Sequence, residues 1–193
     1  TGLKGSWDAT TFELAVFKIA TRNDIVVGAS NDGRVSFTNA GSTRRHGLEV
    51  NIHQAFSAGF GAYLAYSYLD AFVDGGAFDG ARMPGVPRQM LYGELDWQYR
   101  PLGFSTSLSG QWRDRVYVDS KNSDFADRYL VVNYHLEFSQ NAGSWRFSEY
   151  AGVNNLFDRH YIGAVVVNSS NGRFFQPEPG RNFLIGVSAR YAF

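Results

Sequence analysis

Histidines and carboxylates are the residues with which this sequence could do acid, base or metal chemistry. The four histidines lie far apart, without the local pairing that metal sites often show: they are His46, His53, His135 and His160. Glu94 and Asp96 are two residues apart and would share one side of a strand, as part of a glycosidase carboxylate pair could. Because charged residues recur along the whole chain, a polar lining is favoured over catalysis. We predict no enzyme activity, no metal site and no cofactor.

A second cluster with chemical potential is basic. His46 directly follows Arg44 and Arg45. These side chains could bind an anionic ferric chelate or a lipopolysaccharide phosphate through charge-assisted hydrogen bonds. We expect instead that they pair with Glu49 and other carboxylates on the inner side of the fold.

Composition excludes several function classes. The 193 residues carry 18 basic and 18 acidic side chains, so no overall positive field would attract nucleic acid. There is no cysteine, which removes disulfides, thiolate metal sites and a cysteine nucleophile. No segment approaches the roughly 18 consecutive apolar residues of a membrane helix.

The elements that must position these residues are β-strands, because apolar and polar residues alternate from end to end. In the last segment Phe183, Ile185 and Val187 share one parity, while Gly186 and Ser188 share the other. The same pattern recurs about nine times. One parity slip near Phe17 and Lys18 predicts a β-bulge. The fold class is therefore all-β, with about nine antiparallel strands.

Connections between these strands alternate between short and long. Short turns are expected at 8–10, 55–59, 100–103 and 140–144, and long loops at about 26–38, 71–88, 118–128 and 158–180. Transmembrane β-barrels have short periplasmic turns opposite long extracellular loops, and strands of about 9 to 11 residues. We therefore predict an up-and-down transmembrane β-barrel.

Aromatic residues near the expected strand ends fit the interfacial girdles of such a barrel. We assign Trp97, Tyr99, Tyr191 and Phe193 as membrane anchors.

Several motifs carry a family resemblance. They are Asn39-Ala40-Gly41, Gly47-Leu48-Glu49, Met83-Pro84-Gly85-Val86-Pro87, Asn154-Asn155-Leu156-Phe157-Asp158 with Tyr161, Pro179-Gly180-Arg181 and the terminal Phe193. Together and in this order they resemble the C-terminal barrel of TonB-dependent outer-membrane receptors. From their residue types, Asn155 and Asp158 are expected to organise the turn that leaves a strand.

The resemblance implies a complete architecture and a set of partners. Residues 1–193 would be the last nine strands of a 22-stranded barrel, with the plug domain and the TonB-binding segment absent from this sequence. The chain would lie in the bacterial outer membrane, among its lipid and lipopolysaccharide, with its C-terminus in the periplasm. Tyr191 and Phe193 resemble the terminal signal that the barrel-assembly machinery reads.

The implied function is uptake of a ferric siderophore or similar metal chelate. Long loops carry binding residues in many folds. We assign ligand binding to Arg113, Tyr117, Tyr161, Asn168, Arg173 and Phe174.

Two other classes remain open at this point. A passive or structural outer-membrane barrel, such as a porin-like channel, would share the strand pattern. A soluble β protein that binds an apolar ligand would turn its apolar faces inward, which long strands with ionisable inner faces disfavour.

Overall fold

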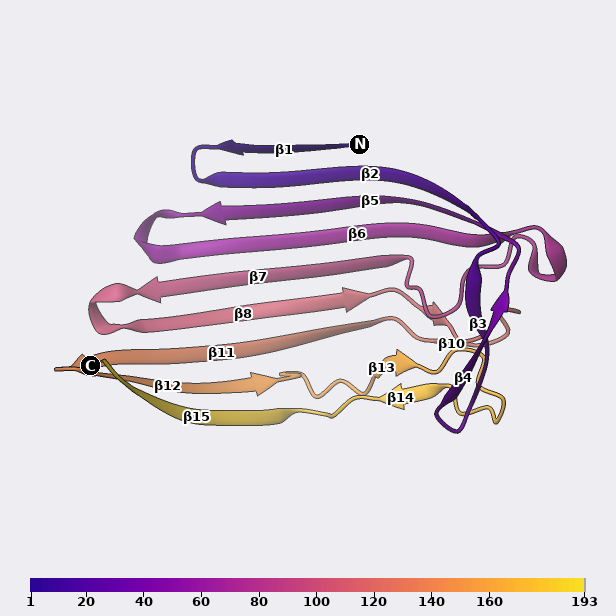
Figure 1. Ribbon diagram of the computed structural model, residues 1–193. Coiled ribbons are helices and arrows are strands. Elements are labelled where there is room, and N and C mark those ends of the chain that lie inside the picture. Colours follow the sequence, from indigo (N-terminus) through magenta and orange to yellow (C-terminus); the bar gives the residue numbers. More distant parts are fainter. Residues whose placement is uncertain (193) are drawn as a thin grey trace.

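A nine-stranded antiparallel sheet forms most of the molecule in the computed structural model, which describes residues 1–192 (Figure 1). Each strand pairs with the next long strand in the chain, which confirms the up-and-down order and the count of nine. The strands are β1 (Gly2–Trp7), β2 (Thr10–Arg22), β5 (Ser42–Ala55), β6 (Phe60–Asp74), β7 (Gln89–Tyr99), β8 (Phe104–Arg113), β11 (Tyr129–Ala142), β12 (Trp145–Asn154) and β15 (Asn182–Tyr191).

The connections confirm the predicted alternation of short turns and long loops. Turns of two to four residues join the strands at one rim, and two of them contain the short 3-10 helices η1 (Ser57–Gly59) and η3 (Arg100–Leu102). Asp8 and Gly143 adopt positive φ in two-residue turns, at 50° and 59°. At the opposite rim lie four loops, 23–41, 75–88, 114–128 and 155–181, which we call the loop cap.

Short elements lie within the loop cap. They are β3 (Ile25–Asn31), β4 (Arg34–Asn39), η2 (Gly76–Phe78), β9 (Val116–Tyr117), β10 (Phe125–Ala126), β13 (Ile162–Val165) and β14 (Phe175–Pro177). The segment 26–38, expected as a loop, is therefore mostly an antiparallel hairpin of β3 and β4. Within residues 1–192, no helix combines the length and apolar character needed to cross a membrane.

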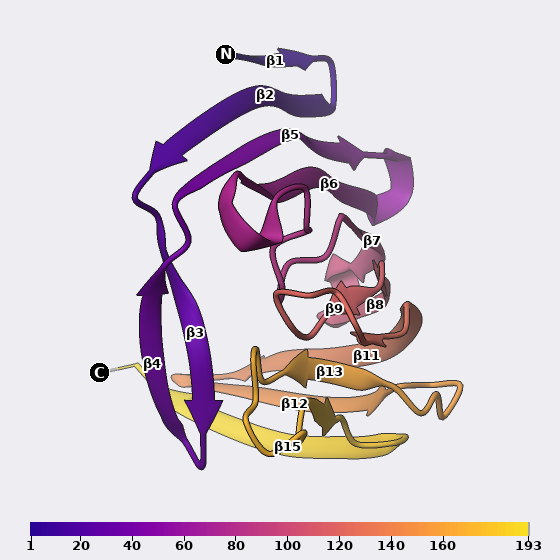
Figure 2. The ribbon, with the colours of Figure 1, turned by 90° about the vertical axis from the view of Figure 1, so that its right-hand side faces the viewer.

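The sheet is curved and open (Figure 2). Its strands follow an arc from β1 to β15, and the β3–β4 hairpin crosses the open side at the loop rim. In the described residues β1 pairs only with β2, and β15 only with β12. The described residues therefore form an open arc of nine strands. That these strands belong to a closed barrel of 22 strands stays a prediction.

The two faces of the sheet differ in polarity. Directly paired residues in an antiparallel sheet point to the same side, so Leu95, Leu108, Tyr134, Val153 and Phe183 form one row across five strands. This convex face is apolar and exposed: Phe183 is 75% exposed and Ile185, one row further, is 86%. The concave face carries the polar rows, including Glu94 with Ser109 and Asn133.

The predicted bulge near Phe17 and Lys18 is wrong. β2 pairs with β5 in unbroken register from Thr10 to Arg22. What changes is the polarity of the two faces: beyond Val16 the convex face becomes charged at Lys18, while Phe17 turns inward and lies over Gly47. The apparent slip in the sequence pattern is this inversion of polarity.

The best-buried residues lie beneath the loop cap rather than in the middle of the sheet. Val116, Val118 and Ala126 are at most 1% exposed, and Ala71 and Val73 of β6 are 4% and 8% exposed. The loops therefore fold back into the concavity and form a small core there.

Aromatic side chains line the convex face near the turn rim, where the predicted anchors lie. The Trp97 ring stacks on Phe60 at 5.8 Å and on Tyr99 at 5.9 Å between centroids, and Tyr191 contacts Trp145 at 5.0 Å. These positions agree with a girdle, and anchoring itself stays a prediction. Phe193 lies outside the described residues.

Candidate functional site

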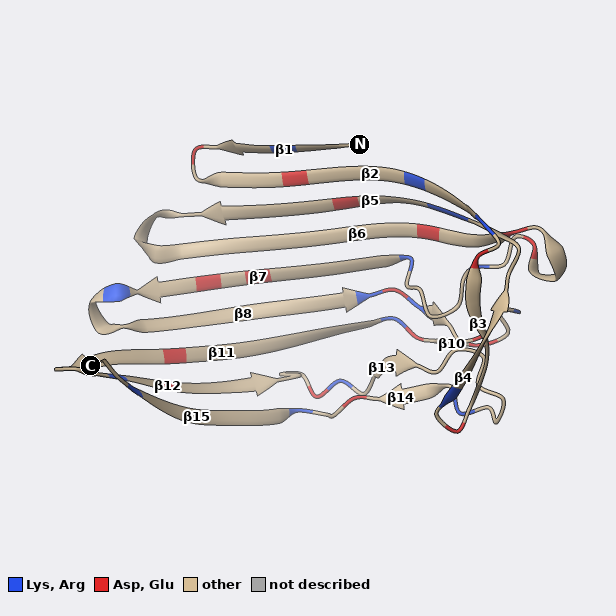
Figure 3. Cartoon of the chain, viewed as in Figure 1, with Lys and Arg blue, Asp and Glu red and all other residues tan. Residues whose placement is uncertain are grey.

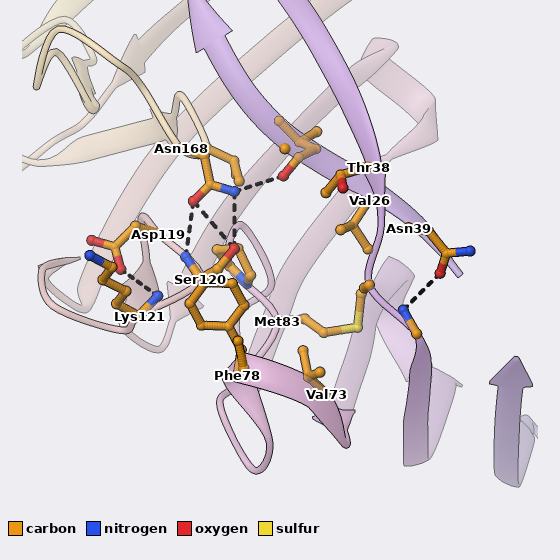
Figure 4. Close-up of a pocket in the computed structure, with 18 of the residues that line it drawn as sticks. Val26, Thr38, Asn39, Val73, Phe78, Met83, Asp119, Ser120, Lys121 and Asn168 are labelled. Carbon is orange, nitrogen blue, oxygen red and sulfur yellow. Dashed lines mark hydrogen bonds between the residues drawn. The ribbon is translucent and has the colours of Figure 1, made fainter. Parts of the chain in front are cut away.

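A cavity of about 960 Å³ opens within the loop cap and is the candidate binding site, here called the loop pocket. All four loops contribute to its wall, together with the ends of β5 and β6. Figure 4 shows Val26 of the hairpin, Phe78 and Met83 of the second loop, and Asn168 of the fourth loop around the same space. The volume is within the usual range for small-molecule sites.

Most of the pocket surface is apolar. The hydrophobic lining residues are Ile25, Val26, Val27, Phe37, Ala40, Val73, Ala77, Phe78, Met83, Pro84, Val167 and Phe174. Three charged side chains complete it, namely Arg45, Asp119 and Lys121. Such a lining suits a ligand with an apolar or aromatic face and few charges.

Asn168 ties three loops together at the edge of this pocket. Its side-chain amide donates to the Val27 carbonyl at 2.7 Å and to the Ser120 hydroxyl at 3.0 Å, while its Oδ1 accepts the Ser120 backbone N–H at 2.9 Å. Its φ of 52° is left-handed, which asparagine tolerates better than most residues. The same segment bonds to Ser30, whose hydroxyl donates to the Val167 carbonyl at 2.8 Å.

Asn122 clamps the second and third loops. Its side chain accepts the backbone N–H of Arg82 at 2.8 Å and donates to the carbonyl of Arg82 at 2.9 Å. Asp119 begins the same turn and accepts the backbone N–H of Lys121 at 2.8 Å and that of Ser123 at 3.1 Å. Partial burial works to raise the pKa of Asp119, but the hydrogen bonds from Ser123 and its neighbours outweigh it and hold the pKa below its ordinary value.

The basic cluster predicted at 44–46 is divided between the two faces. Arg45 points inward and binds Asp24 at 2.6 Å, beside the buried Thr43 hydroxyl that donates to the same carboxylate. Thr43, aided by Arg45, holds the pKa of Asp24 below its ordinary value. Arg44 binds Asp74 and His46 approaches Asp70, both on the convex side. The expected pairing with Glu49 is wrong, because Arg44 and His46 face the opposite side and Arg45 binds Asp24 instead. The expected pairing with another carboxylate of the inner side is confirmed for Arg45 alone.

Arg113 is positioned beneath the fourth loop rather than in the loop pocket. The side chain is on the concave face at the end of β8, and its guanidinium donates to the carbonyls of Ile162 and Gly163 at 2.7 and 2.6 Å. It also lies 4.7 Å from the ring centroid of Tyr129, which contacts Tyr161 at 4.5 Å. Burial raises the pKa of Tyr161. The Arg113 Nε is buried without a hydrogen-bond partner.

Of the six predicted ligand-binding residues, Asn168 and Phe174 line the loop pocket. Arg113 and Tyr161 form the separate cluster beneath it, and Tyr117 lines a smaller cavity of about 280 Å³ near Arg82 and Arg115. Arg173 is exposed on the fourth loop. Ligand contact by all six stays a prediction. The turn role predicted for Asn155 and Asp158 is confirmed: Asn155 Oδ1 accepts the N–H of Arg159 and Asp158 Oδ1 that of Arg181.

Sequence reasoning missed the hairpin wall of the pocket. Val26, Phe37 and Thr38 line it from β3 and β4. A signal was present, because Asp32-Gly33 between two β-rich segments is a typical two-residue hairpin turn. Both residues have positive φ, 44° and 82°.

Comparison with known proteins gives this arrangement a family. The family description "TonB dependent receptor-like, beta-barrel" matches residues 1–156. The chain belongs to the TonB-dependent receptor family. The sequence prediction of that family is confirmed, together with the all-β antiparallel fold.

One curated relative is the "Ferrichrome outer membrane transporter/phage receptor" of Escherichia coli (strain K12). It is 28% identical over 153 residues, which are 77% of this chain and 20% of the relative. The receptor chain thus spans about a fifth of the length of that protein.

Solved structures of other receptors share the fold. The ferric citrate transporter FecA has a TM-score of 0.81 at 18% identity, over 98% of this chain and 30% of that one. The ferric yersiniabactin uptake receptor FyuA of Yersinia pestis has a TM-score of 0.75 at 23% identity, over 100% and 29%. The ferric preacinetobactin receptor BauA of Acinetobacter baumannii has a TM-score of 0.76 at 17% identity, over 97% and 28%.

Proposed function

We propose that this chain is the C-terminal barrel portion of an outer-membrane receptor that imports a metal chelate such as a ferric siderophore. The observation that carries the proposal is the loop pocket, formed by all four loops at one rim of a membrane-type β-sheet. The relatives named for ferrichrome, ferric citrate and ferric yersiniabactin support the choice of cargo.

The open sheet supports the proposal that this chain is one part of a larger, closed barrel. Strands with unpaired backbone groups are not stable in lipid, so β1 and β15 require further strands on their free edges. We place residues 1–193 at the end of a 22-stranded barrel, with the plug and the TonB-binding segment in another part of the protein. The end of β15 lies at the rim of short turns (Figure 1), which fits a periplasmic C-terminus.

The charged residues that line the loop pocket limit which kinds of chelate it could bind. Arg45 is neutralised by Asp24, and Asp119 offsets Lys121 among the lining residues. A polyanionic chelate would be desolvated there without enough cations. The proposed cargo is therefore a chelate of low net charge with an apolar or aromatic face.

Uptake of radioactive iron in iron-starved cells tests this proposal. Cells that lack the receptor are complemented with the full-length protein and supplied with ferrichrome, an uncharged hydroxamate chelate, or with ferric citrate, a polyanion. We expect TonB-dependent uptake that is faster for ferrichrome. Uptake that persists without TonB would instead indicate a passive, porin-like barrel.

A matched pair of hairpin variants tests the pocket. Phe37 lines it, whereas Val35 on the same face of β4 does not, and both are exposed at 66% and 49%. Phe37→Glu is expected to reduce uptake about tenfold, because a carboxylate enters an apolar wall. Val35→Glu is the control and should leave uptake and receptor abundance unchanged. Equal uptake by both variants would remove the loop pocket as the binding site.

A further inference from the structure

The outermost contact between the fourth loop and the β3–β4 hairpin is a single hydrogen bond at an exposed site. The Nδ2 of Asn171 donates to Asp32 Oδ1 at 3.1 Å, and both residues are exposed. Deeper in the same junction, backbone hydrogen bonds of 2.9 and 2.8 Å join Ser30 to the segment 168–170. Figure 3 shows the acidic turn of the hairpin beside the fourth loop. A neutral amide therefore faces a carboxylate at the edge of the loop cap.

Asn171 is followed by Gly172, and this is the one asparagine–glycine pair in the 193-residue sequence. Glycine has no Cβ to hinder the approach of its backbone nitrogen to the preceding side chain. The φ of Gly172 is 74°, and no atom of a non-adjacent residue lies within 4 Å of the place where a Cβ would stand. Its N–H makes only a long hydrogen bond to the Ser169 carbonyl, at 3.4 Å, beyond the usual range. Gly172 is thus an exposed residue whose nitrogen is weakly held.

The side-chain carbonyl of Asn171 is polarised by two donors. Its Oδ1 accepts the Ser169 hydroxyl at 2.8 Å and the Arg173 backbone N–H at 3.1 Å. Donors aimed at a carbonyl oxygen stabilise the negative charge that develops there when a nucleophile attacks the carbon. Both donors are already in place in the folded protein, so this amide carbon is prepared for attack.

Asn168 in the same loop supplies an internal comparison. It precedes a serine rather than a glycine, and its amide nitrogen donates to the Val27 carbonyl at 2.7 Å and the Ser120 hydroxyl at 3.0 Å. Release of that nitrogen would break two partly buried hydrogen bonds, whereas release of the Asn171 nitrogen breaks one exposed hydrogen bond. The fold therefore protects one amide of the fourth loop and leaves the other open to reaction.

We propose that Asn171 is a site of spontaneous deamidation, through attack by the backbone nitrogen of Gly172. This nitrogen gives its proton to water and forms a bond to Cγ of Asn171, while the bond from Cγ to Nδ2 breaks and ammonia leaves with a proton from water. The product is a succinimide ring. Water then adds to one of the two ring carbonyls and opens the ring, which leaves aspartate or isoaspartate. Water is the co-reactant throughout, and nothing is oxidised or reduced.

The modification changes the charge at the junction. The donor to Asp32 is lost, and a carboxylate takes its place opposite another carboxylate. Like charges at an exposed contact repel weakly, and salt screens the repulsion. The hydrogen bonds of Ser30 and Asn168 remain, so the loosening is confined to the hairpin turn at 31–34. The proposal does not rest on the cargo or on transport.

Peptide mass spectrometry of the folded full-length receptor, stored in water enriched in heavy oxygen, tests the reaction. Each deamidation in that water adds a heavy oxygen atom, which separates product formed during storage from product already present. We expect incorporation at Asn171 to be at least about tenfold faster than at Asn168. The rate should rise with pH, because the attacking nitrogen must lose its proton. Heat-modifiable migration confirms that the stored protein is still folded.

Two variants separate the parts of the reaction. Asn171→Gln keeps the amide but lengthens the side chain, which disfavours ring closure, so heavy oxygen should not accumulate there. Ser169→Ala removes a donor to the attacked carbonyl and should slow the reaction about threefold. Ser36→Ala is its control, because it removes an exposed hydroxyl that donates to Ala29. Equal incorporation at Asn171 and Asn168 would overturn the site, and an unchanged rate in Ser169→Ala would overturn the role of its hydroxyl.

Hydrogen exchange of residues 31–34 tests the consequence. Asn171→Asp carries the new charge, whereas Asn171→Ala only loses the hydrogen bonds of the side chain. Exchange should be about threefold faster in the aspartate variant at low salt and equal in the two at high salt. Adding Asp32→Asn should abolish the difference, and asparagine tolerates the positive φ of that position. Equal exchange in Asn171→Asp and Asn171→Ala at low salt would overturn the proposed repulsion.

Discussion

In the wall of the sheet, Ile185 is 86% exposed and Phe183 75%, whereas Val116 and Val118 beneath the loop cap are almost completely buried. The wall is held by long, unbroken backbone ladders and turns its apolar side chains outward, where lipid can cover them. The loop cap has short ladders, a small core, and side chains such as Asn168 and Asn122 that bond to distant backbone groups. The two regions therefore respond to different kinds of substitution, with the wall sensitive to outward charge and the cap to lost polar contacts.

The largest effect is expected at the boundary between the regions. Arg113→Met removes the guanidinium and leaves the carbonyls of Ile162 and Gly163 without their donor. The cost should be about 3 to 4 kcal/mol, because removing one partner leaves buried polar groups unsatisfied. Hydrogen exchange of residues 161–165 would report it as lost protection.

Arg113→Lys is the informative companion, since it keeps the charge and loses the paired donors. A direct ligand contact would weaken chelate binding in both variants without changing exchange in the free receptor. Unchanged hydrogen exchange in Arg113→Met would contradict the view that Arg113 holds the segment around Ile162 and Gly163 in place.

A charge on the outward face of the sheet should lower the free energy of unfolding by nearly as much. Ile185→Arg places a cation on the convex apolar face, and arginine near the midplane of a barrel costs about 3 kcal/mol. Ile185→Ala should have little effect, because no packed protein neighbour is lost at an exposed site. Urea unfolding of the full receptor in lipid vesicles measures both. Equal stability of the two variants would show that lipid does not contact this face.

Loss of a polar contact in the loop cap should have the next largest effect. Asn168→Ala removes hydrogen bonds to Val27 and Ser120 and leaves alanine at a left-handed φ, for a local cost of about 2 kcal/mol. Faster exchange is expected in the β3–β4 hairpin, with the wall unchanged. Asn171→Ala is the control, because all three hydrogen bonds of its side chain are exposed and only one of them, to Asp32, reaches the hairpin. Identical hydrogen exchange in both variants would contradict the conclusion that Asn168 joins the three loops.

The smallest effect concerns Asp24. Because its pKa is lowered in the folded protein, its stabilising contribution is complete above about pH 5 and is lost as the pH falls below about 4. Asp24→Asn should cost about 1 kcal/mol at neutral pH and remove that dependence. Proteolysis of the first loop between pH 3 and 7, read as cleavage rate, is the measurement. An unchanged acid response in the variant would assign the dependence to other carboxylates.

The wall was predictable because each strand repeats a two-residue pattern against two different environments. Residues 183–191 needed no distant partner to reveal which face is apolar. The pattern failed at Phe17 and Lys18, where the environment changes and the polarity of the faces reverses with the register intact. A periodicity rule cannot separate that change from a bulge.

The candidate site was predictable only in part, because its geometry depends on contacts between distant loops. Asn168 and Phe174 were assigned to binding from their residue types, and both line the loop pocket. Arg45 and Lys121 were not assigned, since their position at the pocket follows from strand direction and loop docking. Asn168 reaches Val27 across 141 residues, a contact that no local pattern encodes.

That contact also sets the order in which the molecule can form. Val27 and Asn168 are separated by the segments that make β5 to β12, and closing so long a loop is entropically costly until those strands are in register. The hairpin near the start of the chain must therefore wait for the fourth loop before it can dock. Assembly of the loop pocket is therefore a late event, which follows the pairing of the strands from β5 to β12.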